Sequence, residues 1–309
     1  MTALVTGGAG FIGSNLVDTL LSRNHNVIIV DDFSNGKEEN ISDALLRYTS
    51  SARLFRRDIR EDLSGIFANG IDCVFHLAAL ARVQQSIENP MKFDDVNVHG
   101  TLNLLEHCRK FKVDKFIFSS SSSIYGEPSK DVLEGGRGLS EYHDVPQPLS
   151  PYGLQKLIGE EYCKLYTKIY GVKTACLRYF NVYGERQSID GAYKLVMGIF
   201  ADQLLNNNPL TIVGDGEQKR DFICVKDVVE ANILACDYLR GNVGSECFNI
   251  GSGINHSVNE IAALMGGETV NIPPRLGESR ITLANATKAK TQLGWTPKVR
   301  LEDWIAAHK

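Results

Sequence analysis

A glycine-rich turn near the N-terminus constrains the fold of this chain more than any other feature. Residues 6–13 read T-G-G-A-G-F-I-G, directly after a short apolar run and at the start of a helical pattern. Gly8, Gly10 and Gly13 satisfy G-x-G-x-x-G, and Gly7 adds a second register. Glycines allow a tight turn there, and backbone N–H groups at the helix start can then approach a pyrophosphate. The turn therefore predicts a dinucleotide site. Its expected cofactor contacts are Gly7, Gly10, Phe11, Ile12 and Gly13.

Short apolar runs alternate with amphipathic segments up to about residue 180. The runs at 26–30, 73–76 and 115–119 are rich in Val, Ile and Phe, and helical patterns include 88–111 and 151–170. Buried strands that alternate with helices predict a doubly wound (Rossmann) α/β fold with a parallel sheet, and a second, smaller α/β lobe that binds the substrate. The expected division is a Rossmann domain at 1–180, to which about 226–250 returns, and a substrate lobe at 181–225 and 251–309.

A carboxylate follows the second predicted strand. The run N-V-I-I-V ends in Asp31, which can accept both hydroxyls of an adenosine ribose and would repel a 2′-phosphate. No Arg or Lys follows until Lys37, so NAD is favoured over NADP. Further cofactor contacts are expected where later strands end, although plain packing is an equal alternative for the alanines. These residues are Asp58, Ile59, Leu77, Ala78 and Ala79.

Tyr152 and Lys156 supply the second chemical signal. Tyr152 alone among the eleven tyrosines has a lysine four residues later, and Pro151 suits the first turn of a helix. The two side chains would lie one turn apart on one face. A lysine there lowers the phenol pKa by stabilising phenolate, which would make Tyr152 a general base. Alone, the Tyr152–Lys156 pair is weak evidence for catalysis. In a chain that also carries a dinucleotide-binding motif, it is strong evidence.

Composition excludes several other classes of function. The net charge of −4 offers no basic surface for nucleic acid or an anionic membrane. The seven cysteines form no C-x-x-C pair, and the seven histidines form no H-E-x-x-H, so we expect buried thiols and no metal site. Because no signal peptide or membrane span is evident, we expect a cytoplasmic protein.

Several motifs together resemble the extended short-chain dehydrogenase/reductase superfamily, in its nucleotide-sugar 4-epimerase branch. The resemblance covers nearly the whole chain. The motifs that carry it are T-G-G-A-G-F-I-G at 6–13, H-L-A-A at 76–79, F-S-S-S-S-S-I-Y-G at 118–126, Tyr152 with Lys156, R-Y-F-N-V-Y-G at 178–184, G-D-G-E-Q-K-R-D-F at 214–222 and R-L-G-E at 275–278.

The resemblance gives the serine run 119–123 a chemical role. It implies that Ser121 bonds the C4 oxygen of the sugar opposite Tyr152, and that Ser122 and Ser123 touch the hexose. Relatives that dehydrate or decarboxylate nucleotide sugars carry an acid at the position of Ser123, so those activities are disfavoured. The cofactor contacts that it adds are Ser119, Tyr152, Lys156 and Tyr179.

The resemblance also implies a set of substrate contacts in the second lobe. Asn181 and Arg220 would hold the diphosphate of a UDP-sugar, and Arg275 would be a second clamp. Glu278 would contact the uridine ribose, although the family often has Asp there. Thr282 matches a position where a small residue leaves room for an N-acetyl group and a Tyr goes with hexoses bare at C2.

The implied reaction is NAD-dependent C4 epimerisation of a UDP-hexose through a transient 4-keto sugar. The expected pair is UDP-GlcNAc and UDP-GalNAc, with UDP-glucose and UDP-galactose as the alternative. A UDP-glucuronate 4-epimerase is less favoured because Gln84 is neutral where such relatives place an Arg. The alternative from another class is a non-catalytic NAD-binding regulator. A homodimer through 88–111 and 151–170 is expected, unless both helices only cover the sheet.

Overall fold

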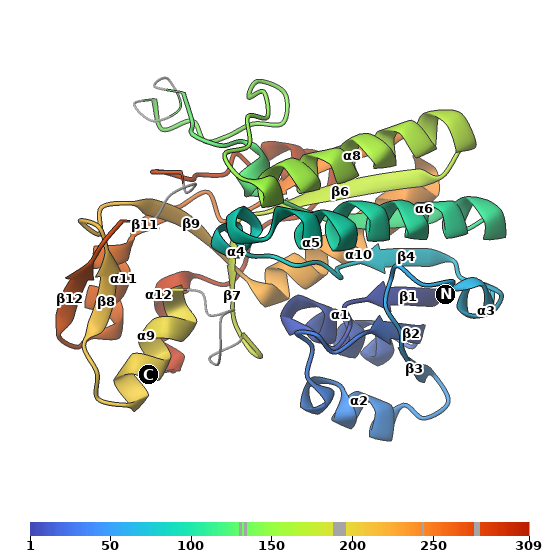
Figure 1. Cartoon of the computed structure of the whole chain (residues 1–309), viewed down its shortest axis with the longest axis horizontal. Coiled ribbons are helices and arrows are strands. Elements are labelled where there is room, and N and C mark those ends of the chain that lie inside the picture. Colours follow the sequence, from blue (N-terminus) through green and yellow to red (C-terminus); the bar gives the residue numbers. More distant parts are fainter. Residues whose placement is uncertain (130–131, 133–134, 188–195, 243, 275–278, 309) are drawn as a thin grey trace.

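The computed structural model describes residues 1–129, 132, 135–187, 196–242, 244–274 and 279–308. Within this part of the chain, seven strands form one sheet in the order β10-β6-β5-β4-β1-β2-β3, and every neighbouring pair is parallel (Figure 1). The strands are β1 (Thr2–Thr6), β2 (Asn26–Asp31), β3 (Ala52–Arg56), β4 (Cys73–His76), β5 (Lys115–Ser121), β6 (Lys173–Tyr179) and β10 (Ser245–Ile250). The predicted doubly wound fold is confirmed.

Helices cover both faces of this sheet. One face carries α1 (Phe11–Ser22), α2 (Ser42–Arg47) and α10 (Val225–Gly241), and the other carries α3 (Ser64–Phe67), α6 (Gly100–Phe111) and α8 (Pro151–Tyr170). Between α3 and α6 lie α4 (Val83–Glu88), α5 (Pro90–Asp94) and the wider turn Asp95–His99. The predicted helix at 88–111 is therefore interrupted, since Pro90 starts a new helix after the non-helical Asn89.

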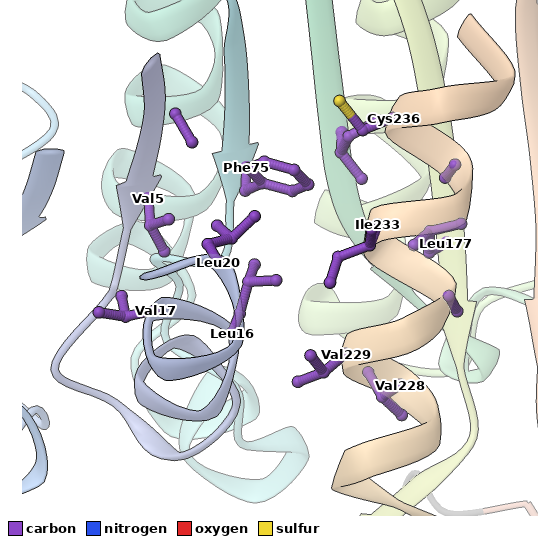
Figure 2. Packing of buried hydrophobic residues seen from close by; sticks show 14 of the residues in the cluster. Val5, Leu16, Val17, Leu20, Phe75, Leu177, Val228, Val229, Ile233 and Cys236 are labelled. Carbon is purple, nitrogen blue, oxygen red and sulfur yellow. The ribbon is translucent and has the colours of Figure 1, made fainter. Parts of the chain in front are cut away.

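Strand side chains alternate between two cores. Val5 and Phe75 point towards α1 and α10, whereas their neighbours Leu4 and Val74 point towards α6 and α8. In Figure 2, Leu16 and Leu20 of α1 face the side of α10 that carries Val229 and Ile233. Both faces of the strands are thus buried, which explains their continuous apolar runs.

The remaining elements form a smaller group with its own core. Its strands are β7 (Asn181–Tyr183), β8 (Leu210–Val213), β9 (Lys219–Cys224), β11 (Asn255–Ser257) and β12 (Thr269–Ile272). Its helices are α9 (Val196–Leu205), α11 (Val258–Met265) and α12 (Leu301–Ala307). They make a three-stranded sheet β11-β9-β7 and a pair β12-β8, which pack around Tyr183 and Phe200. The wide turn Ala289–Leu293 packs instead into the core of the large sheet, on the side that carries α10.

The thiols lie inside the molecule. All seven cysteines are in the described part of the chain and are free; six are buried, and Cys247 on β10 is half-buried. Among the described residues no helix is long and apolar enough to cross a bilayer.

Candidate active site

One cavity of about 1300 Å³ opens where the strands of the large sheet end. In doubly wound sheets this carboxyl edge is where ligands bind. Every predicted site residue in the described part of the chain lines it, whereas Arg275 and Glu278 lie outside the described residues. The lining residues that sequence predicted are Gly7, Gly10, Phe11, Ile12, Gly13, Asp31, Asp58, Ile59, Leu77, Ala78, Ala79, Ser119, Ser121, Ser122, Ser123, Tyr152, Lys156, Tyr179, Asn181, Arg220 and Thr282.

The glycine turn is packed too closely to carry side chains. Gly7 has φ +68°, and a Cβ on it would lie 2.7 Å from the backbone N of Ala78. A side chain on Gly13 would overlap the carbonyl of Gly7. Ala78 therefore packs against the turn and also lines the cavity. The turn leaves the start of α1 accessible to an anion.

Asp31 ends β2 as a buried carboxylate. Its Oδ2 accepts a hydrogen bond from the N–H of Ala9 at 2.9 Å, and its Oδ1 accepts one from Phe33 at 2.8 Å. Burial raises the pKa of Asp31, while the two backbone donors act in the opposite direction. Glycines without room for a Cβ, a free helix start and this carboxylate form a cradle that fits the phosphates and the ribose of a dinucleotide.

The helix α8 carries Tyr152 and Lys156 at its start. Ser150 caps the helix by accepting a hydrogen bond from the N–H of Gly153 at 3.2 Å. Lys156 Nζ donates to the carbonyl of Ser119 at 2.7 Å and lies 5.9 Å from the centre of the Tyr152 ring. The predicted juxtaposition of the phenol and the ammonium is therefore present.

The pKa values differ from the simple expectation of an acidified phenol. Burial raises the pKa of Tyr152, and a hydrogen bond with Ser121 lowers it in part. Burial lowers the pKa of Lys156 to about 8. Desolvation thus dominates the phenol in this structure, because the Lys156 ammonium donates to a backbone carbonyl rather than to Tyr152.

The five serines belong to a strand and a turn, not to a linker. β5 extends to Ser121, whose Oγ accepts a hydrogen bond from the N–H of Ser123 at 3.2 Å. Ser119 hydrogen-bonds with the Tyr179 hydroxyl at 3.1 Å, and Ser120 donates to Glu160 Oε1 at 2.5 Å. Successive serines therefore contact different elements, as alternation along a strand requires.

Sequence reasoning gave no role to Glu160 or Arg178, and it did not predict the contact of Ser120 with Glu160. Arg178 on β6 pairs with Glu160 of α8 at 2.7 Å, and both side chains are buried. The signals in the sequence were the position of Glu160, four residues after Lys156, and the place of Arg178 at the start of the motif R-Y-F-N-V-Y-G. A buried pair cannot be distinguished from a surface pair by spacing alone.

Three predicted substrate contacts meet on β7, β9 and the segment after residue 278. Asn181 Nδ2 donates to the carbonyl of Asp221 at 3.1 Å and to Thr282 Oγ1 at 3.4 Å. Thr282 Oγ1 also accepts from the N–H of Asp221 at 3.3 Å. Arg220 Nη1 donates to the carbonyls of Lys219 and Arg280. All three residues also line the cavity.

The fold and the site define a dinucleotide-binding enzyme with a Tyr–Lys pair. A model of the NAD dependent epimerase/dehydratase family matches residues 3–251. The chain belongs to this family, which confirms the resemblance seen in its motifs. It is an isomerase that uses NAD.

Relatives match over nearly the whole chain. A putative UDP-glucose 4-epimerase of Methanocaldococcus jannaschii is 42% identical over 98% of this chain and 95% of its own. The UDP-glucose 4-epimerase of Thermotoga maritima, solved with UDP-glucose, has a TM-score of 0.89 and 40% identity, over 99% of this chain and 96% of that one.

Two further solved structures have equal TM-scores and different substrates. The UDP-N-acetylglucosamine 4-epimerase of Methanobrevibacter ruminantium has a TM-score of 0.89 and 33% identity, over 98% of this chain and 95% of that one. The UDP-glucuronic acid 4-epimerase of Bacillus cereus was solved with UDP-glucuronic acid and NAD. It has a TM-score of 0.89 and 36% identity, and the match covers 99% of this chain and 97% of that one. Overall similarity therefore does not separate the three sugars.

Proposed function

We propose that the chain interconverts the C4 epimers of a UDP-hexose, and that UDP-GlcNAc and UDP-GalNAc are its preferred pair. The observation that supports the proposal is that one cavity is lined by the glycine turn, by Tyr152, Lys156 and Ser121, and by Asn181, Arg220 and Thr282. A cofactor and a sugar nucleotide can therefore meet at the phenol. We also propose the division into a Rossmann domain (1–180 with about 226–250) and a substrate lobe (181–225 and 251–309).

The residues of the cradle would hold NAD. The glycine turn and the start of α1 would take the pyrophosphate, Asp31 would accept the ribose hydroxyls, and Lys156 would bind the second ribose. The bound NAD would supply the site with an acceptor and donor of hydride for C4 of the sugar. The chain's own groups handle the proton and the geometry.

Tyr152 would remove the proton of the C4 hydroxyl as a phenolate and return it afterwards. Ser121 would hold the same oxygen, since its hydroxyl already hydrogen-bonds with the Tyr152 side chain. Lys156 would stabilise the phenolate by its charge. Because the 4-keto sugar must turn between the two transfers, the diphosphate has to be held while the hexose is not. Asn181 and Arg220 would hold it, with Arg275 and Glu278 as further contacts.

The preference for an N-acetylated sugar rests on Thr282. It is small and lines the cavity beside Asn181, where a larger side chain would narrow the space for a C2 substituent. UDP-glucose with UDP-galactose is the first alternative. UDP-glucuronate is the second. It is less favoured because Gln84, which lines the same cavity, is neutral where such relatives place an Arg, although Arg82 also lines the cavity nearby.

Proton NMR of the purified protein tests the reaction and the sugar together. UDP-GlcNAc, UDP-glucose and UDP-glucuronate are incubated separately, first without added cofactor and then with NAD, and the anomeric and H4 signals are followed. Faster conversion of UDP-GlcNAc supports the proposal. Faster conversion of UDP-glucose or UDP-glucuronate keeps the reaction and overturns the argument from Thr282. No product with any sugar, even with NAD, would mean that the proposed sugar or the proposed reaction is wrong.

We further propose a cytoplasmic homodimer that pairs the helices at 88–111 and 151–170. Free thiols fit a reducing compartment. The dimer is supported by large apolar side chains that α8 and α5 expose to solvent. They are Met91, Leu154, Leu165, Ile169 and Tyr170. A second copy that covers this face would bury them.

A further inference from the structure

Glu160 is a buried carboxylate to which the reaction above gives no role. It lies on α8, four residues after Lys156 and eight after Tyr152, so the three side chains follow roughly one face of the helix. Its exposed fraction is 4%. A carboxylate at this depth is stable only when it is paired and hydrogen-bonded.

The partners of Glu160 come from three different strands. The Nε–H of Arg178 on β6 donates a hydrogen bond to Oε1 of Glu160 at 3.0 Å, and its Nη2–H donates one to Oε2 at 2.7 Å. The two residues therefore form a bidentate pair. Ser120 of β5 donates its hydroxyl to Oε1 at 2.5 Å, and the Cys247 thiol of β10 lies 3.5 Å from Oε2. Four donors thus meet one carboxylate, so its negative charge is fixed in the interior.

Arg178 extends the connection towards the sheet edge. Its Nη1 donates to the Tyr125 hydroxyl at 2.7 Å, and Tyr125 donates to Asn249 Oδ1 on β10 at 2.8 Å. Tyr125 follows the short turn Ser122–Ile124 that contains two of the predicted sugar contacts. The Glu160–Arg178 pair therefore joins α8 to β5, β6 and β10, the three strands that end beside the proposed sugar site.

Two neighbouring ties fix α8 against β5. Lys156 binds the carbonyl of Ser119, and one helical turn later Glu160 binds the hydroxyl of Ser120. Ser121 is the next residue of the strand. Because the strand and the helix are held at two successive residues, Ser121 and Tyr152 have little freedom to move apart.

Glu160 also acts on Lys156 through its charge. Burial lowers the pKa of Lys156 to about 8, and the charges of Cys163 and Glu160 both act to raise it. Loss of the Glu160 charge would therefore lower the Lys156 pKa further. The titratable and charged groups packed around these two residues are Cys163 on α8, Arg178 and Cys176 on β6, Cys247 on β10, Tyr125 after β5 and His76 on β4.

We propose that Glu160 is a positioning residue of the reaction: held by Arg178, it fixes the β5 serines against α8, beside the Lys156 ammonium. It acts through Ser120 and Lys156 and lines no part of the cavity. This inference rests on the proposed roles of Tyr152 and Lys156.

Glu160→Gln tests the charge with little change of shape. We expect kcat at pH 8 to fall several-fold, because a lower Lys156 pKa leaves fewer Lys156 side chains protonated at that pH, with KM within about twofold of wild type. The alkaline limb of the kcat profile should move to lower pH. Glu230→Gln is the matched control, since Glu230 forms an ion pair of similar length with Arg23 on the exposed side of α10. It should leave kcat and the profile unchanged.

Ser120→Ala removes the tie to β5 and keeps the charge. We expect kcat to be several-fold lower, while the alkaline limb of the kcat profile stays at the same pH as in the wild type. Thermal midpoint and bound NAD are measured for every variant. A folded, NAD-loaded Glu160→Gln protein with wild-type kcat and pH profile overturns the inference, and so does a loss of stability alone. If Glu160→Gln fails to fold, a wild-type kcat in Ser120→Ala overturns it. An active Tyr152→Phe variant would instead count against the proposed function itself.

Discussion

At the scale of single residues, the proposed reaction depends first on the phenol of Tyr152. Tyr152→Phe keeps the ring packed and removes the hydroxyl that we propose exchanges the C4 proton. We expect kcat to fall by about 10²–10⁴-fold, with bound NAD unchanged. Rates from the NMR assay measure this. Tyr142→Phe is the control, since Tyr142 is exposed and does not line the cavity. Equal rates for the two variants would remove Tyr152 from the mechanism.

Lys156 gives a pH dependence whose sign follows from its environment. Its pKa is about 8 in the folded chain and about 10.4 when unfolded, so the unfolded chain binds more protons between these values. As pH rises from about 8 to 10, the shifted pKa of Lys156 therefore increases the free energy of unfolding by up to about 3 kcal/mol. Other buried groups also titrate there, so the quantity to compare is wild type against Lys156→Met in urea unfolding at both pH values. Identical pH slopes would contradict the shift.

Thr282 tests the argument on sugar size. Thr282→Tyr should lower kcat/KM for UDP-GlcNAc by about 10²-fold and spare UDP-glucose, because only the first carries a group at C2 that needs the space. Thr282→Val keeps the size and removes the hydroxyl that accepts from Asn181 and Asp221, so it separates width from hydrogen bonding. A parallel loss for both sugars would show that Thr282 sets no preference.

At the scale of elements, the contact between the β1 turn and the end of β4 determines the shape of the cradle. Gly7 and Gly70 have similar φ values of +68° and +73°, but only Gly7 has a neighbour within contact of an added Cβ. Gly7→Ala should therefore destabilise the chain by about 1–3 kcal/mol more than Gly70→Ala and reduce bound NAD. Urea unfolding and the absorbance of released cofactor measure both effects. Equal destabilisation of the two variants would mean that this packing contributes nothing.

The sequence predicted what has a periodic or local signal. The strand run, the glycine turn, Asp31 and the Tyr152–Lys156 pair are close in sequence or repeat with a regular period, and the structure brings them together. The break at Pro90 within 88–111 was overlooked because amphipathic periodicity continues across it. The Glu160–Arg178 pair could not be predicted, since it joins a helix to a strand through burial, which no spacing encodes.

At the scale of the whole molecule, α8 would serve two surfaces at once. Its inner face carries Tyr152 and Lys156, whereas Leu165 and Ile169 are 44% and 58% exposed on the outside. We expect Leu165→Glu with Ile169→Glu to convert a dimer into a monomer, because two buried charges would face each other across the interface. Light scattering after gel filtration measures the mass. A monomeric wild-type protein would contradict the proposed dimer.

Modification of the buried thiols can report on local opening of the structure. A thiolate at the surface reacts with an alkylating reagent, but six of the seven cysteines here are shielded by the sheet and its helices. These cysteines can be modified only after the surrounding structure opens. The rate of modification therefore measures the rate of that opening rather than the reactivity of the reagent. The order in which the cysteines are modified would show which parts of the molecule open first.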